Sequence, residues 1–119
     1  MEDLKLYESE YRFLSLIWEF EPVRSTELSK KALEVLGWKK STCFTVLKKL
    51  TERGFVKNES AVVTSLVGKE EVQRYESEML LNKAFDGSLP AFLTAFLKDR
   101  KLSAEEVEKI RHMIEEAGE

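Results

Sequence analysis

The sequence predicts a mainly α-helical protein with one small β-hairpin. Apolar residues recur at helical spacing through most of the 119 residues, so helices dominate the prediction. Two runs that are rich in β-branched or aromatic residues, 55–57 and 61–67, flank an Asn-containing turn at 58–60 and indicate the hairpin. Three helices come before this hairpin, and that order is typical of a winged helix, which is a variant of the helix-turn-helix.

The first three helices are predicted from apolar stripes and from signals at their ends. They cover residues 8–19, 25–36 and 39–53. Pro22 ends the first because the residue before a proline avoids helical geometry, while Gly37 and Gly54 suit left-handed caps after the second and third. The residues expected on the inner faces of the first two helices are Tyr11, Leu14, Ile17, Trp18, Leu28, Ala32, Leu33 and Leu36.

The remainder of the chain reads as helical. A helix over 69–85 ends at Asp86-Gly87, and Ser88 caps a short helix that runs through Leu97. Ser103 and Glu106 form the pattern of a capping box, which opens a last helix.

Charge is divided unevenly along the chain, although the net charge is only −3. Residues 24–57 carry nine bases and three acids, a local excess of +6, whereas residues 68–119 carry eight bases and twelve acids, or −4. Because contacts to phosphate depend on the local field, this basic middle section favours an anionic partner.

The third helix has two chemically different faces when it is drawn at 100° per residue. Its core face holds Cys43, Val46, Leu47 and Leu50, and the opposite face carries hydroxyl groups, ammonium groups and one aromatic ring. Such a helix suits the major groove of duplex DNA, where hydroxyls and lysines meet base edges or phosphates and an aromatic ring meets a thymine methyl. The predicted DNA-binding residues are Lys39, Lys40, Ser41, Thr42, Phe44, Thr45, Lys48, Lys49 and, in the hairpin, Lys57.

The run WKKSTCFTVLKKLTERGFV at 38–56 resembles the recognition-helix signature of the penicillinase repressor family, which includes copper-responsive relatives. Residues 8–19 are similar to the opening helix of that family, and residues 75–78, 85–89 and 95–97 are similar to its C-terminal dimerisation segment. The resemblance implies a homodimeric bacterial transcriptional repressor that binds a palindromic operator and is inactivated by a membrane-bound sensor protease. It places Lys40, Ser41, Thr42, Phe44 and Thr45 at positions that read bases and phosphates, with Lys48 and Lys49 nearer the backbone.

Several features of the chain depart from the family pattern. Tyr7 and Arg24 stand where the family often has Ser or Thr caps, and the hairpin turn 58–60 is short and acidic. Ala95-Phe96 occupies the place of the Asn-Phe bond that is cut in β-lactam-responsive members. The cysteine-rich tail of copper-responsive members has no counterpart in residues 115–119, which argues against copper sensing through such a tail.

The C-terminal part contains more large apolar side chains than one internal helix face can use. Left exposed, they would form a patch larger than a monomer normally tolerates, although an intramolecular helical core could also absorb them. We expect a dimer interface made of Leu89, Phe92, Leu93, Phe96, Leu97, Ile110 and Ile114. The predicted domains are therefore a winged-helix DNA-binding domain over 1–67 and a helical dimerisation domain over 68–119.

Other classes of function find little support in the residues. Cys43 is the single cysteine and is expected in the core, and His112 is the single histidine, so no disulfide, metal site, cofactor or enzymatic activity is expected. No small-molecule site, secretory signal or membrane-spanning segment is recognisable, and a cytoplasmic protein is the simplest interpretation. The serious alternative is a winged-helix adaptor that binds another protein and no DNA.

Overall fold

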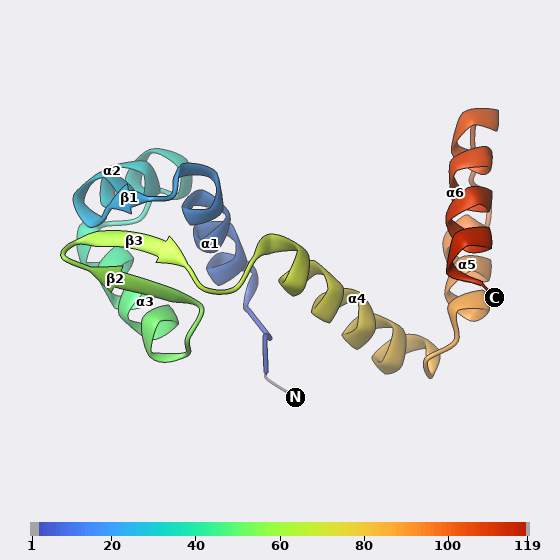
Figure 1. Ribbon diagram of the computed structural model, residues 1–119, viewed down its shortest axis with the longest axis horizontal. Coiled ribbons are helices and arrows are strands. Elements are labelled where there is room, and N and C mark those ends of the chain that lie inside the picture. The colour runs from blue at the N-terminus through green and yellow to red at the C-terminus, as the bar shows by residue number, and fades with distance from the viewer. Residues whose placement is uncertain (1–2, 119) are drawn as a thin grey trace. The chain divides into compact units, whose positions relative to one another are not determined.

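The computed structural model describes residues 3–118 and divides the chain into two compact units, Met1–Met79 and Leu80–Glu119. Each unit is considered by itself. The elements in order are α1 (Glu8–Phe20), β1 (Val23–Arg24), α2 (Ser25–Leu36), α3 (Lys40–Glu52), β2 (Val56–Glu59), β3 (Val62–Ser65), α4 (Lys69–Phe85), α5 (Leu89–Leu97) and α6 (Ala104–Ala117) (Figure 1). The mainly helical winged-helix prediction is confirmed, while the predicted domain boundary between 67 and 68 stays a prediction.

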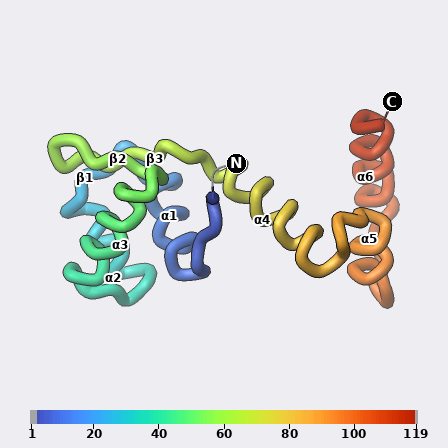
Figure 2. The backbone as a smooth tube through the Cα atoms, turned by 90° about the horizontal axis from the view of Figure 1, so that it is seen from below, coloured from blue at the N-terminus to red at the C-terminus, as the bar shows by residue number. Residues whose placement is uncertain are grey.

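The core of the first unit lies where α1, α2 and α3 gather on one side of the sheet (Figure 2). Leu14 and Ile17 of α1 are fully buried, as expected, and Phe13, which precedes Leu14, is equally buried. Trp18 is only half-buried, because its indole N–H reaches out to donate a hydrogen bond to the carbonyl of Val67 at 2.9 Å. This bond attaches α1 to the chain that leaves the sheet.

The inner face of α2 is narrower than predicted. Leu28 and Ala32 are buried with Ser25 and Ser29, but the side chain of Leu33 is 60% exposed. The prediction that Leu33 faces the core is wrong. Small residues form most of the buried face because α2 packs against both α1 and α3, which leaves little room for a third leucine.

The starts of α1 and α2 use substitutes for the missing Ser or Thr caps. At α1 the carboxylate of Glu10 accepts a hydrogen bond from the backbone N–H of Tyr7 at 2.8 Å. At α2 the backbone N–H of Ser25 donates to the carbonyl of Ala61 at 2.9 Å. Both devices satisfy a free N–H in the first turn, so these helices begin where the sequence predicts.

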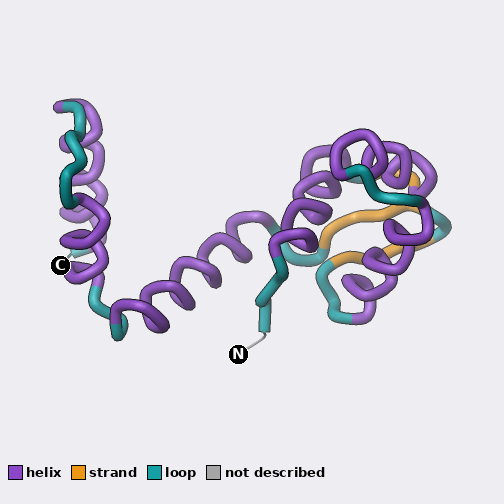
Figure 3. The backbone as a smooth tube through the Cα atoms, turned by 180° about the vertical axis from the view of Figure 1, so that it is seen from behind, coloured by secondary structure: helices purple, strands orange, loops and turns teal. Residues whose placement is uncertain are grey.

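The sheet has three antiparallel strands in the order β1-β3-β2, drawn in orange in Figure 3. β1 was not predicted, because two residues after a proline carry no recognisable strand pattern; Val23 pairs with Val63. The hairpin turn was predicted at 58–60, but β2 continues to Glu59, which pairs with Val62. The turn therefore consists of Ser60 and Ala61, both with positive φ angles of 53° and 64°. Such two-residue turns follow the natural twist of a hairpin.

The second unit contains the end of α4 together with α5 and α6. The hydroxyl of Ser88 accepts a hydrogen bond from the N–H of Ala91 at 3.1 Å and caps α5, as predicted. The predicted capping box of α6 is also present, with Ser103 Oγ accepting from the N–H of Glu106 and Glu106 Oε1 accepting from that of Ser103. Between residues 80 and 118, however, no side chain is fully buried.

None of the helices in residues 3–118 has both the length and the apolar character that crossing a lipid bilayer requires.

Replacing Ala61 with glycine should stabilise the first unit. A left-handed conformation costs an alanine about 1–2 kcal/mol, and the greater freedom of glycine in the unfolded chain returns about 0.5–1 kcal/mol of this. We therefore expect Ala61→Gly to raise the free energy of unfolding by about 0.5–1 kcal/mol in urea titrations. Replacing the exposed Glu34 of α2, in the same unit, with glycine should lower the stability instead. A destabilised Ala61→Gly variant would contradict the turn geometry.

Candidate functional site

The rotation of α3 is fixed by three fully buried side chains, Cys43, Leu47 and Leu50. Val46 is half-buried and packs on the same core. The predicted core face of this helix is therefore present in the structure. Because these residues recur every three or four positions, the opposite face of α3 must point away from the protein.

The outward face of α3 carries hydroxyl and charged side chains. Ser41, Thr45, Lys48 and Glu52 are all exposed and lie one turn apart along the helix. The hydroxyl of Thr45 donates to the carbonyl of Ser41 at 2.9 Å, which leaves its oxygen free to accept a hydrogen bond from outside. Lys39, Lys40, Thr42 and Lys49 are exposed on either side of this row.

The four lysines of this region have no acidic partner among the residues that the structure describes. Within residues 3–118, the recorded ion pairs involve none of Lys39, Lys40, Lys48 and Lys49. In addition, the side chain of Lys39, the N-cap, makes no hydrogen bond to the first turn of α3, so that turn presents unpaired backbone N–H groups. The partial positive charge of the helix N-terminus adds to the field of the lysines. The surface formed by these lysines and the N-terminus of α3 is therefore suited to bind phosphate groups.

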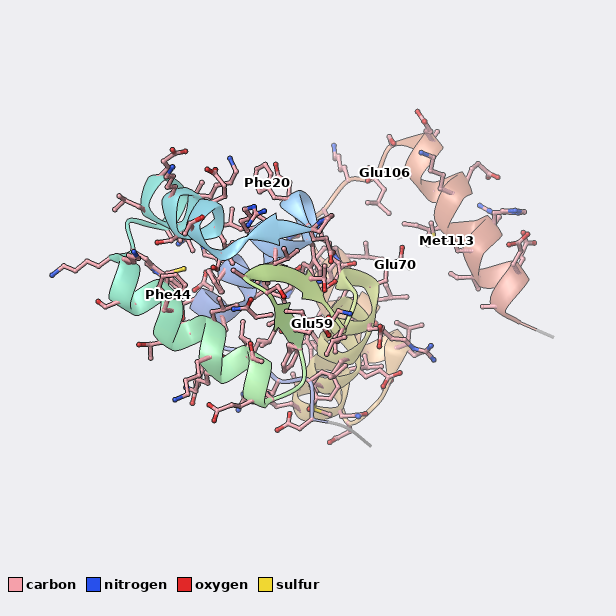
Figure 4. All side chains as sticks on the ribbon, turned by 60° about the vertical axis from the view of Figure 1, so that its left-hand side comes forward. Phe20, Phe44, Glu59, Glu70, Glu106 and Met113 are labelled. Atoms are coloured by element: carbon pink, nitrogen blue, oxygen red, sulfur yellow. The ribbon has the colours of Figure 1, made fainter. Side chains whose placement is uncertain are left out.

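Phe44 differs from the expectation that it lies on the exposed face. It is half-buried and packs against the core from the flank of α3, and the ammonium of Lys40 lies 5.9 Å from the centre of its ring (Figure 4). The reason is its angle on the helix, which places it between the core face and the outward face. Phe44 is thus only partly accessible to solvent.

A shallow groove runs between α3 and β2. It has a volume of about 270 Å³, and its lining residues are Phe44, Leu47, Lys48, Thr51, Glu52 and Asn58. Asn58 and Glu52 were missed as candidates for the site. Asn58 was assigned to a turn; its place in β2, on the edge beside α3, follows only from the strand register, which the residue types do not reveal.

Two basic residues of the region are already engaged within the protein. Lys57 of β2 lies 3.7 Å from the carboxylate of Glu59, also on the hairpin. Arg53, which follows α3, donates a hydrogen bond to the carbonyl of Lys5 at 2.6 Å and lies 3.8 Å from the buried carboxylate of Glu10. Arg53 therefore contributes to the internal structure, and the cationic surface rests mainly on the lysines.

The second unit holds an apolar groove of about 480 Å³ between α5 and α6. Of the residues predicted for a dimer interface, Leu89, Phe96, Ile110 and Ile114 are exposed and Phe92, Leu93 and Leu97 are half-buried. The rings of Phe92 and Phe96 stack at 5.5 Å, and all seven residues except Leu89 line the groove.

The remaining candidates have ordinary surroundings. His112 is exposed on α6, 3.2 Å from the carboxylate of Glu116. Within the described residues, no group of three His, Cys, Asp or Glu side chains is placed to hold a metal ion. Cys43 is inaccessible to solvent, and its burial raises the pKa of the thiol, opposed in part by a hydrogen bond with Ser29.

The thiol of Cys43 should be unreactive in the folded protein. Burial blocks access, and a raised pKa reduces the thiolate fraction at pH 8, so two effects slow the reaction. We expect a disulfide reagent such as DTNB to label Cys43 at least 100-fold more slowly in the native protein than in 6 M guanidinium chloride. Rapid labelling of the native protein would show that the core face of α3 opens.

Comparison with known proteins agrees with this architecture. The family model described as Penicillinase repressor matches residues 6–116. A "Penicillinase repressor" of Bacillus licheniformis is 22% identical over 116 residues, which cover 94% of this chain and 91% of the relative. The "Methicillin resistance regulatory protein MecI" of Mammaliicoccus sciuri is 23% identical over 119 residues, which cover 94% and 97%. The chain belongs to the penicillinase repressor family.

Proposed function

We propose that the protein is a bacterial transcriptional repressor that binds a palindromic operator as a homodimer, with α3 in the major groove of each half-site. The observation that carries the proposal is the outward face of α3. Ser41, Thr45 and Lys48 are exposed together, and the neighbouring lysines have no acidic partner among residues 3–118. Membership of a family described as repressors supports the same function.

In this proposal the residues of α3 make two kinds of contact with DNA. Ser41, Thr42 and Thr45 would meet base edges or phosphates, while Lys39, Lys40, Lys48 and Lys49 would neutralise phosphates. The exposed part of Phe44 offers an apolar contact for a thymine methyl or a deoxyribose. Lys57 would contribute little, because Glu59 competes with phosphate for its ammonium group.

The proposed dimer follows from the second unit. A unit of about 40 residues in which no side chain between residues 80 and 118 is fully buried lacks a core of its own, and units of this size usually need association to be stable. A second copy that covers the α5–α6 groove would bury about five to seven large apolar side chains. Each contributes about 1.5–3 kcal/mol before entropy is subtracted. Two copies also double the phosphate contacts and fix the spacing of half-sites.

Inactivation by a membrane-bound sensor protease remains part of the proposal. The bond Ala95–Phe96 lies inside α5, and a helical bond does not fit a protease site. Cleavage there would therefore require local unfolding of α5, which a helix without buried side chains permits at low cost. We place the protein in the cytoplasm, where operator DNA is found, and assign it no catalytic role.

Salt dependence of DNA binding tests the proposal against the adaptor alternative. Neutralised phosphates release counterions, so the logarithm of the affinity for promoter DNA should fall linearly with the logarithm of the salt concentration. We expect Lys48→Ala combined with Lys49→Ala to make that slope shallower by about one to two per subunit. Lys109→Ala, on α6, is the matched control and should leave it unchanged. A slope near zero in the wild type would favour the adaptor.

Phe96→Asp should separate the proposed dimer. The side chain is 47% exposed in the single chain, so an aspartate there is tolerated in the monomer but would be buried in the dimer. Sedimentation equilibrium should give the monomer mass of 13.8 kDa for the variant and twice that for the wild type. Val35→Asp changes an exposed apolar residue of α2, 55% accessible, and should remain dimeric. An unchanged dimer in Phe96→Asp would refute this interface.

A further inference from the structure

Arg53 joins the end of α3 to the N-terminal segment of the chain. Its Nη2 donates to the carbonyl of Lys5 at 2.6 Å and reaches that of Asp3 at 3.5 Å, and its Nη1 lies 3.8 Å from Glu10 Oε1. The guanidinium also lies over the ring of Phe55, 4.8 Å from its centre. We call residues 3–7 the N-terminal strap. Arg53 holds this strap against the end of the helix that carries the candidate DNA-binding face.

The other side of the strap is attached to α4. The hydroxyl of Tyr75 donates a hydrogen bond to Asp3 Oδ1 at 3.1 Å, and the backbone N–H of Lys5 donates to the same oxygen at 2.9 Å. The bond from Lys5, reinforced by the one from Tyr75, lowers the pKa of Asp3 below its ordinary value, so the carboxylate keeps its charge to a lower pH than an ordinary aspartate does. Figures 1 and 3 show the strap passing the start of α4.

Few other contacts hold α4 on the first unit. Val72 is the one fully buried residue among the described side chains of α4. A helix held at one point can pivot about that point, whereas a second point of attachment fixes its direction. Tyr75 is three residues further on and lies on the same side of the helix as Val72. The hydrogen bond between Tyr75 and Asp3 is therefore the second point of attachment of α4.

We propose that Arg53 and the N-terminal strap are a positioning device that fixes the direction of α4 relative to α3. This inference rests on the proposed function. α4 begins in the first unit and continues past Met79 into the second, which carries the proposed dimer interface. The direction in which α4 leaves the first unit then sets the distance between the two α3 helices of a dimer. The strap would accordingly determine which spacing of operator half-sites the protein accepts.

The test uses the full chain with Tyr75→Phe and Asp3→Ala, because both residues lie outside the core and the variants should fold. Half-sites recovered from random duplexes are joined at the selected spacing and at spacings changed by one and two base pairs. The wild type should prefer one spacing, and each variant should lose at least about threefold of that preference. Affinity for a single half-site should stay unchanged, and the double variant should be no worse than either single one.

A second measurement tests the anchoring without DNA. Amide hydrogen exchange at residues 72–79 should become several-fold faster in Tyr75→Phe and Asp3→Ala, while exchange in α1–α3 stays the same. Tyr11→Phe is the matched control, since the hydroxyl of Tyr11 makes no recorded hydrogen bond to residues 3–118 and its loss should alter neither readout.

The outcomes separate the inference from the function on which it rests. Unchanged exchange in α4 would overturn the anchoring. Faster exchange with an unchanged spacing preference would overturn the control of spacing. If the wild type bound no DNA, the proposed function would fail, and the exchange experiment would still decide whether the strap holds α4.

Discussion

The structure of the first unit depends on how α3 is seated in the core. Cys43, Leu47 and Leu50 lock the rotation of this helix, because each is fully buried against α1, α2 and the sheet. Once that rotation is fixed, Ser41, Thr45 and Lys48 have no direction to point except outward. The candidate DNA-binding face is therefore a consequence of core packing, and a change in the core would alter it without touching any residue on its surface.

The sequence was sufficient to predict the elements whose signals are local. The caps at Ser88 and Ser103, the end of α2 at Gly37 and the core face of α3 follow from residue types a few positions apart, and the structure contains them. Features that depend on distant partners were not predictable. β1 exists because Val23 and Arg24 pair with β3, about 40 residues away, and neither residue signals a strand by itself.

The same distinction between local signals and distant partners explains which parts of the candidate site could be predicted. The outward direction of Thr45 and Lys48 could be predicted from helical periodicity alone. The flanking place of Phe44 also follows from its angle on the helix, about 100° from Cys43. The engagement of Arg53, in contrast, depends on the carbonyls of Asp3 and Lys5, about 50 residues away. Leu33 was predicted in the core but is exposed, because an apolar residue at a core-facing position is buried only where another element covers it.

Chemical-shift mapping tests most directly whether the outward face of α3 contacts duplex DNA. On titration with a duplex selected from a random pool, the account predicts that the largest amide shifts fall on residues 40–49. Residues 104–117 of α6 should show small shifts. Large shifts on another surface, with the signals of Ser41, Thr45 and Lys48 unmoved by a bound duplex, would contradict the account.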